Sequence, residues 1–203
     1  MIGQSRLDDT VDVVQLPIVQ RTATDAPASI GAASGSPIYY PHASTLRRAW
    51  QWQYAPPELH GPDLARVAHH EAGHVVLLEW IGLTGATATA TPSNGWCIMP
   101  PVPANCPDPG DDVTGELAAT AASIFHAGAM AELLYLGIKW TGPLHYPKQV
   151  DFQRDDDMLL QRFGRLSSAG HGFAQRVALH VLAERWPRVR EIADALVLRG
   201  VWE

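Results

Sequence analysis

Apolar positions recur at helical spacing through the middle of the chain, and the clearest run begins at Asp63. Helix-forming residues lead into an apolar segment that continues to Ile81, and Gly82 follows it. Pro62 and Asp63 predict the start of a helix with Asp63 as its N-cap, and Gly82 predicts its end. We therefore expect one long helix between Asp63 and Gly82.

Further helical patterns occupy most of the second half of the sequence. A cluster of small residues inside the first of them would allow another helix to approach closely. We expect Gly170 to Gly172 to interrupt the chain, and Gly200 to close the last helix. The predicted helices are Glu116–Gly137, Met158–Leu166, Phe173–Glu184 and Val189–Leu198.

Alternation of small apolar and polar residues replaces helical spacing after the first helix. Ala and Thr alternate over Thr84–Thr91, which is typical of a strand with one small apolar face. Pro92–Gly95 is a turn signal, and Trp96–Met99 can form the return strand of a hairpin. The predicted fold class is mainly α with a small β-sheet (α+β), with two or three strands beside the long helix.

The first sixty residues follow a different pattern, so we divide the chain into an N-terminal segment, 1–60, and a domain, 61–203. Leu7–Val19 can form short strands, and residues 22–37 have the composition of a linker. An aromatic cluster then either covers the core of the domain or forms a contact surface for a second copy or another protein, with packing favoured. The cluster consists of Tyr39, Tyr40, Trp50, Trp52 and Tyr54.

Composition narrows the class of protein. The chain has 203 residues, 46% hydrophobic and 18% charged, with a net charge of −6 and no basic block, so a nucleic-acid partner is not expected. The sequence has neither an apolar run long enough for a membrane span nor a secretory signal, so we expect a cytoplasmic protein. Cys97 and Cys106 are expected to be reduced thiols.

The motif His70-Glu71-Ala72-Gly73-His74 lies inside the predicted long helix and reads H-E-x-x-H. Residues four apart on a helix share a face, so the imidazoles of His70 and His74 can bind one Zn²⁺ ion, with Glu71 as a candidate general base. A surface helix with two solvated histidines is the alternative. Gly73 argues against it, because a glycine inside a helix costs about 1 kcal/mol relative to alanine and so indicates close packing.

Catalytic zinc needs three protein ligands, and the motif supplies two. The candidates for the third are Glu116, His126, Glu132, Asp155, Asp156, Asp157 and several loop histidines. His126 is better explained as a core or boundary residue, whereas Glu132, an acid on a small helix face, should have a partner. The three consecutive aspartates could also cap a helix and favour its dipole.

These motifs, taken in order, resemble the peptidase domain of FtsH-type ATP-dependent zinc proteases, and more closely their small ATPase-free relatives. The H-E-A-G-H motif matches letter for letter, and the helix of the pattern A-G-x-x-A-E, a late aspartate and two C-terminal helices follow. The matching segments are His70–His74, Thr87–Gly95, Ala127–Glu132, Asp155–Asp157, Ala178–Trp186 and Ile192–Gly200. Residues 1–60 match nothing in that family.

The resemblance implies an FtsH-peptidase-like helical zincin with zinc held by His70, His74 and an aspartate. Where the family has Asn/Ser-Asp-Leu, this chain has three aspartates. Asp156 shares a helix face with Leu159, Leu160 and Phe163 and is our expected ligand, with Asp155 and Asp157 as alternatives.

The resemblance also implies that the strand Thr87–Thr91 borders the cleft, where its edge would pair with an extended peptide. As a separate hypothesis, Glu132 would contact a ligand histidine and fix its tautomer. The chain lacks a phosphate-binding loop of the G-x-x-x-x-G-K-[ST] type, so the implied zinc metalloendopeptidase would act without ATP.

The implied reaction is hydrolysis of peptide bonds in peptides or unfolded protein segments, by zinc-activated water with Glu71 as general base. Two alternatives stay open: a catalytically silent peptidase-like module for binding or regulation, and a different zinc hydrolase such as an amidase.

Overall fold

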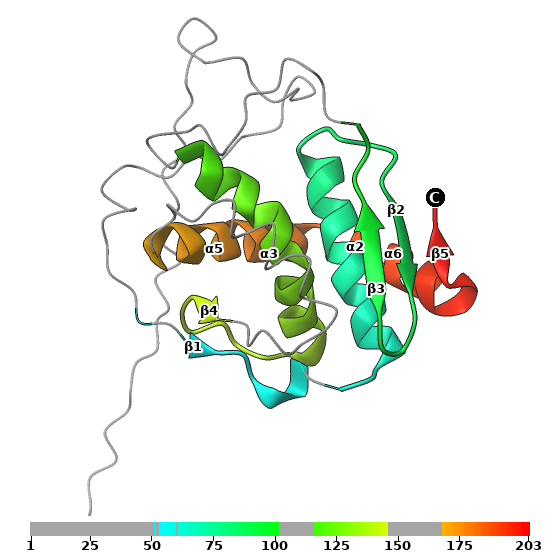
Figure 1. Cartoon of the computed structure of the whole chain (residues 1–203), viewed down its shortest axis with the longest axis horizontal. Coiled ribbons are helices and arrows are strands. Elements are labelled where there is room, and N and C mark those ends of the chain that lie inside the picture. Colours follow the sequence, from blue (N-terminus) through cyan, green and yellow to red (C-terminus); the bar gives the residue numbers. More distant parts are fainter. Residues whose placement is uncertain (1–50, 52, 60, 102–115, 146–167) are drawn as a thin grey trace, which may run out of the picture.

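Four helices, a three-stranded sheet and a two-stranded parallel pair make up the computed structural model, which describes residues 51, 53–59, 61–101, 116–145 and 168–203 (Figure 1). This arrangement is mainly helical with a three-stranded antiparallel sheet, so the expected α+β class is confirmed. The elements in chain order are β1 Gln53–Tyr54, η1 Pro57–Leu59, α2 Leu64–Trp80, β2 Thr87–Ala90, β3 Gly95–Ile98, α3 Glu116–Leu136, β4 Leu144–His145, α5 Ser168–Glu184, α6 Trp186–Arg199 and β5 Val201–Trp202.

Helix α2 lies at the centre of the fold, with the three-stranded sheet on one side and α3 on the other (Figure 1). Both predicted ends are confirmed. Asp63 caps the helix, since its carboxylate accepts a hydrogen bond from the backbone N–H of Arg66 at 3.1 Å. Gly82 follows the last turn with a φ of +89°, a conformation that favours glycine. Nearly every residue of α2 is buried, because other elements cover it from several directions.

Helices α2 and α3 approach closely at Gly73. A Cβ atom added there would lie 2.7 Å from the carbonyl oxygen of Ala127 and 2.8 Å from the Cβ of Ala131. The close packing inferred from Gly73 is therefore confirmed, as is the role of the small residues on α3. This contact places the backbone of α3 directly against the helix that carries the H-E-x-x-H motif.

The sheet has the strand order β3–β2–β5, and all its pairs are antiparallel. Ala88 and Ala90 of β2 are buried, as the Ala/Thr alternation predicts. The predicted hairpin is present, since Ala90 pairs with Gly95 and Thr87 with Ile98. The expectation that the edge of the first strand would accept a peptide is wrong, because β2 is the central strand and has neighbours on both sides. Within the sheet, β3 is the edge strand that borders α2.

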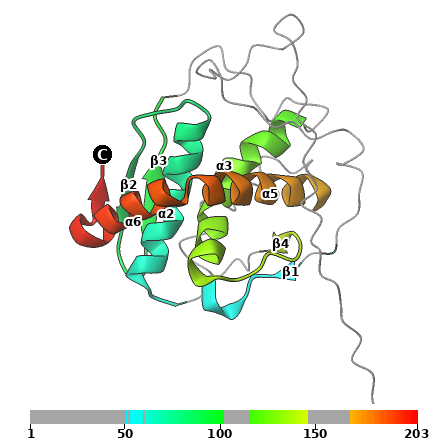
Figure 2. The same cartoon turned by 180° about the vertical axis from the view of Figure 1, so that it is seen from behind.

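Helices α5 and α6 follow one another across the back of the fold, α5 against α3 and α6 against α2 (Figure 2). The predicted break at Gly170–Gly172 is wrong, because α5 runs continuously through both glycines from Ser168. Gly172 instead allows a close contact: a Cβ atom there would lie 3.1 Å from Cγ of Pro143. Gly200 ends α6 in a left-handed conformation, as predicted, and β5 follows it.

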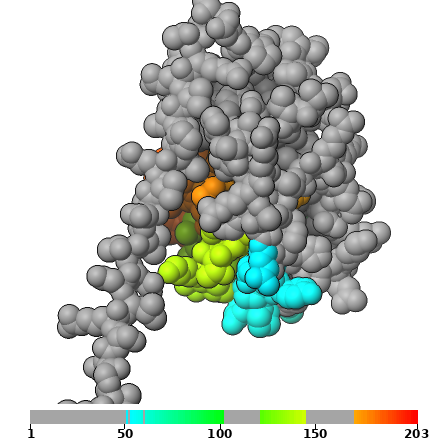
Figure 3. All heavy atoms as spheres, turned by 90° about the vertical axis from the view of Figure 1, so that its left-hand side faces the viewer, coloured from blue at the N-terminus to red at the C-terminus, as the bar shows by residue number. Residues whose placement is uncertain are grey.

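Residues before the long helix also belong to the fold. β1 pairs in parallel with β4, and Leu59 of η1 is buried in the main core. Figure 3 shows this cyan segment lying beside the yellow-green segment that contains β4. Residues 53–59 of the expected N-terminal segment therefore pack with the domain. Tyr54 is 86% exposed, so this member of the aromatic cluster does not cover the core.

Several predicted features lie outside the described residues. They are the segment Leu7–Val19, the linker 22–37, the aromatic residues Tyr39, Tyr40, Trp50 and Trp52, Cys106, the aspartates Asp155, Asp156 and Asp157, and the helix Met158–Leu166. Within the described ranges, none of the helices has the length and apolar character needed to cross a bilayer.

Candidate metal centre

His70 and His74 are buried on the face of α2 that packs against α3. Their side chains come from successive turns of the helix, and their ring centroids lie 4.9 Å apart with planes at 65°. The exposed fractions are 1% for His70 and 6% for His74. A pair of solvated surface histidines is therefore excluded, and the motif forms part of the interior.

Each imidazole is held at Nδ1 by an acceptor on α3. Nδ1 of His70 lies 2.6 Å from Oε1 of Glu132, and Nδ1 of His74 lies 2.8 Å from the carbonyl oxygen of Ile124. A carbonyl oxygen only accepts, so Nδ1 of His74 carries the proton and donates it. Glu132 also accepts from a guanidinium, so it too is an acceptor toward His70. In a neutral ring this tautomer carries its lone pair on Nε2, the atom that binds a metal.

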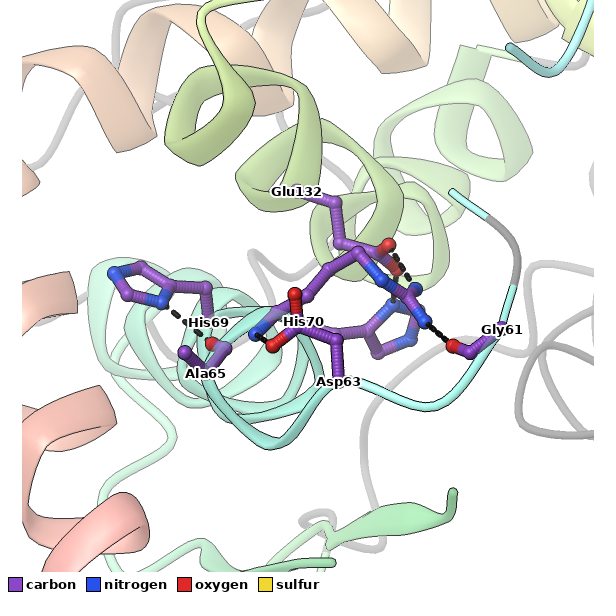
Figure 4. A network of polar contacts seen from close by, with 7 residues as sticks. Gly61, Asp63, Ala65, His69, His70 and Glu132 are labelled. Carbon is purple, nitrogen blue, oxygen red and sulfur yellow. Dashed lines mark hydrogen bonds and ion pairs between the residues drawn. The ribbon is translucent and has the colours of Figure 1, made fainter. Parts of the chain in front are cut away.

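Glu132 is the centre of a buried polar network (Figure 4). It is fully buried on α3, and its carboxylate receives both Nδ1–H of His70 and the Nη1–H of Arg66, the latter at 2.5 Å. The guanidinium of Arg66 also donates to the carbonyl oxygen of Gly61. The partner expected for Glu132 is thus present, and it is a histidine of the motif.

Glu71 lies under the start of β3. Its side chain is 2% exposed, and a Cβ atom added at Gly95 would lie 2.6 Å from Oε1 and 2.8 Å from Cγ of Glu71. The same added atom would lie 2.8 Å from Cγ1 of Val67. The absence of a side chain at Gly95 therefore leaves the space that Glu71 occupies beside the hairpin.

The two donors that lie within the described residues, the imidazoles of His70 and His74, fit Zn²⁺. Imidazoles whose Nδ1–H is held by an acceptor are usual protein ligands of Zn²⁺, which they bind through Nε2. Among the described residues, three or more His, Cys, Asp or Glu side chains do not come together in a group that could hold a metal. The expected third ligand, Asp156, and its alternatives Asp155 and Asp157 lie outside those residues.

Two other histidines near the motif, His69 and His126, contact side chains of the neighbouring helices. His69 stacks between Tyr135, at 4.1 Å, and Trp186, at 5.6 Å, and its Nδ1–H donates to the carbonyl oxygen of Ala65. Burial lowers the pKa of His69 below its ordinary value of 6.5. His126 is buried, as expected, with its Nε2 atom 3.0 Å from Nδ1 of His171 on α5.

Comparison of the chain with protein-family models, with curated proteins and with solved structures finds no match.

Sequence reasoning missed three parts of this site: the guanidinium of Arg66, the carbonyl of Ile124 and the close contact at Gly95. A signal for Arg66 was available, because it lies four residues before His70 and so shares its buried helix face. The carbonyl of Ile124 leaves no comparable signal, because every residue carries one, and Gly95 is accounted for in the sequence by the turn signal Pro92–Gly95 alone.

Proposed function

We propose that this chain is a zinc-dependent metallopeptidase that hydrolyses peptide bonds in peptides or unfolded protein segments. The observation that carries the proposal is the pair of acceptors, Glu132 and the carbonyl of Ile124, at Nδ1 of the two motif histidines. Such partners orient imidazoles for metal binding and raise their basicity as ligands.

His70 and His74 would hold the zinc ion through Nε2, and Asp156 would be the third ligand, with Asp155 and Asp157 as alternatives. Bound zinc supplies Lewis acidity, which polarises the scissile carbonyl and makes water a stronger nucleophile near neutral pH. The Glu71 carboxylate takes the proton of the attacking water and delivers it to the nitrogen of the departing amine. Burial of Glu71 against β3 holds it on the side of α2 that faces the hairpin.

The peptide substrate would lie along β3. This strand is the sheet edge next to Glu71, and Trp96 and Ile98 on it are 51% and 60% exposed. An extended peptide can add to such an edge through backbone hydrogen bonds, and the apolar side chains then contact every second residue of the peptide. The resemblance to the FtsH-type peptidase domain supports the same assignment of fold and activity.

Changing Glu71 to Gln tests the role of the carboxylate. We expect Glu71→Gln to retain zinc, measured by elemental mass spectrometry, and to lose cleavage of a fluorogenic peptide library by at least about 100-fold, because the amide cannot accept the proton. Glu79→Gln, the same change farther along α2, is the matched control and should cleave normally. Cleavage that survives in Glu71→Gln would refute the role of Glu71.

The same measurement includes His74→Ala, which should lose the zinc of the wild-type protein. Absence of zinc from the wild-type protein, even after reconstitution, would refute the enzyme proposal. Zinc without cleavage of any peptide would favour the second candidate, a catalytically silent binding module. The exposed apolar residues Trp96 and Ile98 support that candidate as well, because they can hold a peptide whether or not it is cleaved.

A further inference from the structure

Arg66 is buried one helical turn before His70 and contacts Glu132, the carboxylate that holds this histidine. Only 1% of its surface is exposed, although arginine is rarely buried unless it is paired. Its guanidinium donates to the Glu132 carboxylate, at 2.5 Å, and to the carbonyl oxygen of Gly61 in the segment before α2. The H-E-x-x-H motif itself does not require an arginine at this position.

The two oxygens of Glu132 are divided between Arg66 and His70. Oε2 accepts from the guanidinium and Oε1 accepts from Nδ1 of the imidazole. A carboxylate with one partner can rotate about its last torsion, whereas two partners fix both oxygens. The guanidinium also balances the negative charge of a side chain that has no exposure to water.

We infer that Arg66 is a positioning residue for the metal ligand His70 and acts through Glu132. It holds the carboxylate where Oε1 accepts from Nδ1, and this contact aims Nε2 of His70 at the metal. The inference rests on the metal site of the proposed function, but not on peptidase activity. An arginine suits this task because its planar fork of donors reaches a carboxylate and a carbonyl at once, which a lysine ammonium does less well.

The test measures binding of Zn²⁺ to the full chain in competition with a chromophoric chelator, at one fixed pH. Arg66→Met removes the guanidinium and keeps the aliphatic part of the side chain. The double variant Arg66→Met/Glu132→Gln removes both charges, so it avoids an unpaired buried carboxylate and stays informative if the single variant does not fold.

Arg188→Met is the matched control. Arg188 also pairs with a carboxylate of α2, since its guanidinium donates to both oxygens of Glu79 at 3.1 and 2.6 Å. That pair lies near the opposite end of the helix from Arg66. The control thus removes a guanidinium–carboxylate contact from α2 without touching the metal site.

We expect Arg66→Met and the double variant each to bind Zn²⁺ about 10- to 100-fold more weakly than the wild-type protein, because both disturb the contact that orients His70. Arg188→Met should bind zinc within about twofold of wild type. The visible d–d spectrum of bound Co²⁺ should change in Arg66→Met and not in Arg188→Met, since only the former alters the orientation of a ligand.

Wild-type zinc affinity and an unchanged Co²⁺ spectrum in folded Arg66→Met, or wild-type affinity in the double variant, would overturn the inference. Weakening of the same size in Arg188→Met would also overturn it, because the effect would then be one of general stability. A wild-type protein that binds zinc but cleaves no peptide refutes the peptidase and leaves this inference standing.

Discussion

The imidazole of His70 is confined by atoms that have little freedom to move. Glu132 holds its Nδ1 atom, and the backbone of α3 passes directly beside its ring at Gly128. A Cβ atom added at Gly128 would lie 2.3 Å from Nε2 of His70 and 2.4 Å from Cδ2. A glycine at this position is therefore needed to leave space for the ring.

Gly128→Ala should weaken binding of the proposed zinc ion by at least about tenfold, because the new methyl group displaces the ring that Glu132 orients. Zinc affinity by chelator competition measures this effect. Gly172→Ala is the control: it lies inside α5, and its Cβ atom would meet only Pro143, at 3.1 Å. Equal zinc affinity in Gly128→Ala and wild type would show that His70 is not confined there.

Helices α2 and α3 pack with their backbones unusually close, and this contact brings Glu132 and Ile124 to the motif. The sequence predicted both helices, because apolar and small residues recur along each of them at helical spacing. It also predicted the close approach from Gly73 and the alanine-rich stretch of α3. The packing of this pair was thus largely predictable from local pattern.

Gly73→Ala should lower the free energy of unfolding, although a change from glycine to alanine inside a helix usually raises it. Helix propensity alone predicts a gain of about 1 kcal/mol from this change. The added Cβ atom would instead lie 2.7 Å from the backbone oxygen of Ala127, so α2 and α3 must separate, and we expect a net loss of about 1–3 kcal/mol in the free energy of unfolding. Urea denaturation of the metal-free protein decides the sign, and a stabilised variant would contradict the close contact.

Other elements could not be predicted from local pattern. Gly170 and Gly172 predict a break, yet α5 continues through both and packs against α3, so tertiary packing overrides the low helix propensity of glycine. The two-residue strands β1, β4 and β5 pair with strands far away in the sequence, so local periodicity does not predict them. The third metal ligand stays a prediction from helix-face geometry and family resemblance.

Three helices meet around His69, and this junction couples the whole fold to pH. His69 of α2 stacks on Tyr135 of α3 and Trp186 of α6, away from Glu132 (Figure 4). Burial lowers the pKa of His69, so the folded protein holds the ring neutral at pH values where the unfolded chain has bound a proton. Below about pH 6.5 the unfolded state therefore gains protons first, and stability falls as pH decreases.

His69→Phe should reduce this loss of stability. Phenylalanine keeps the stacking and does not titrate, so the free energy of unfolding should fall less steeply below pH 6.5 than in the wild-type protein. The difference in slope is at most about 1.4 kcal/mol per pH unit, the value for one proton. Denaturation curves between pH 7 and pH 5 measure it, and parallel pH profiles would show that His69 titrates normally in the folded state.

The central position of β2 has a consequence for the order of folding. Its partner β3 follows within one hairpin, whereas β5 lies roughly 110 residues later in the chain. During synthesis on the ribosome, the second edge of β2 stays unpaired until Val201 and Trp202 have emerged. In that interval the nascent hairpin exposes an unpaired strand edge next to a partly formed core, the kind of surface to which chaperones and other nascent chains bind.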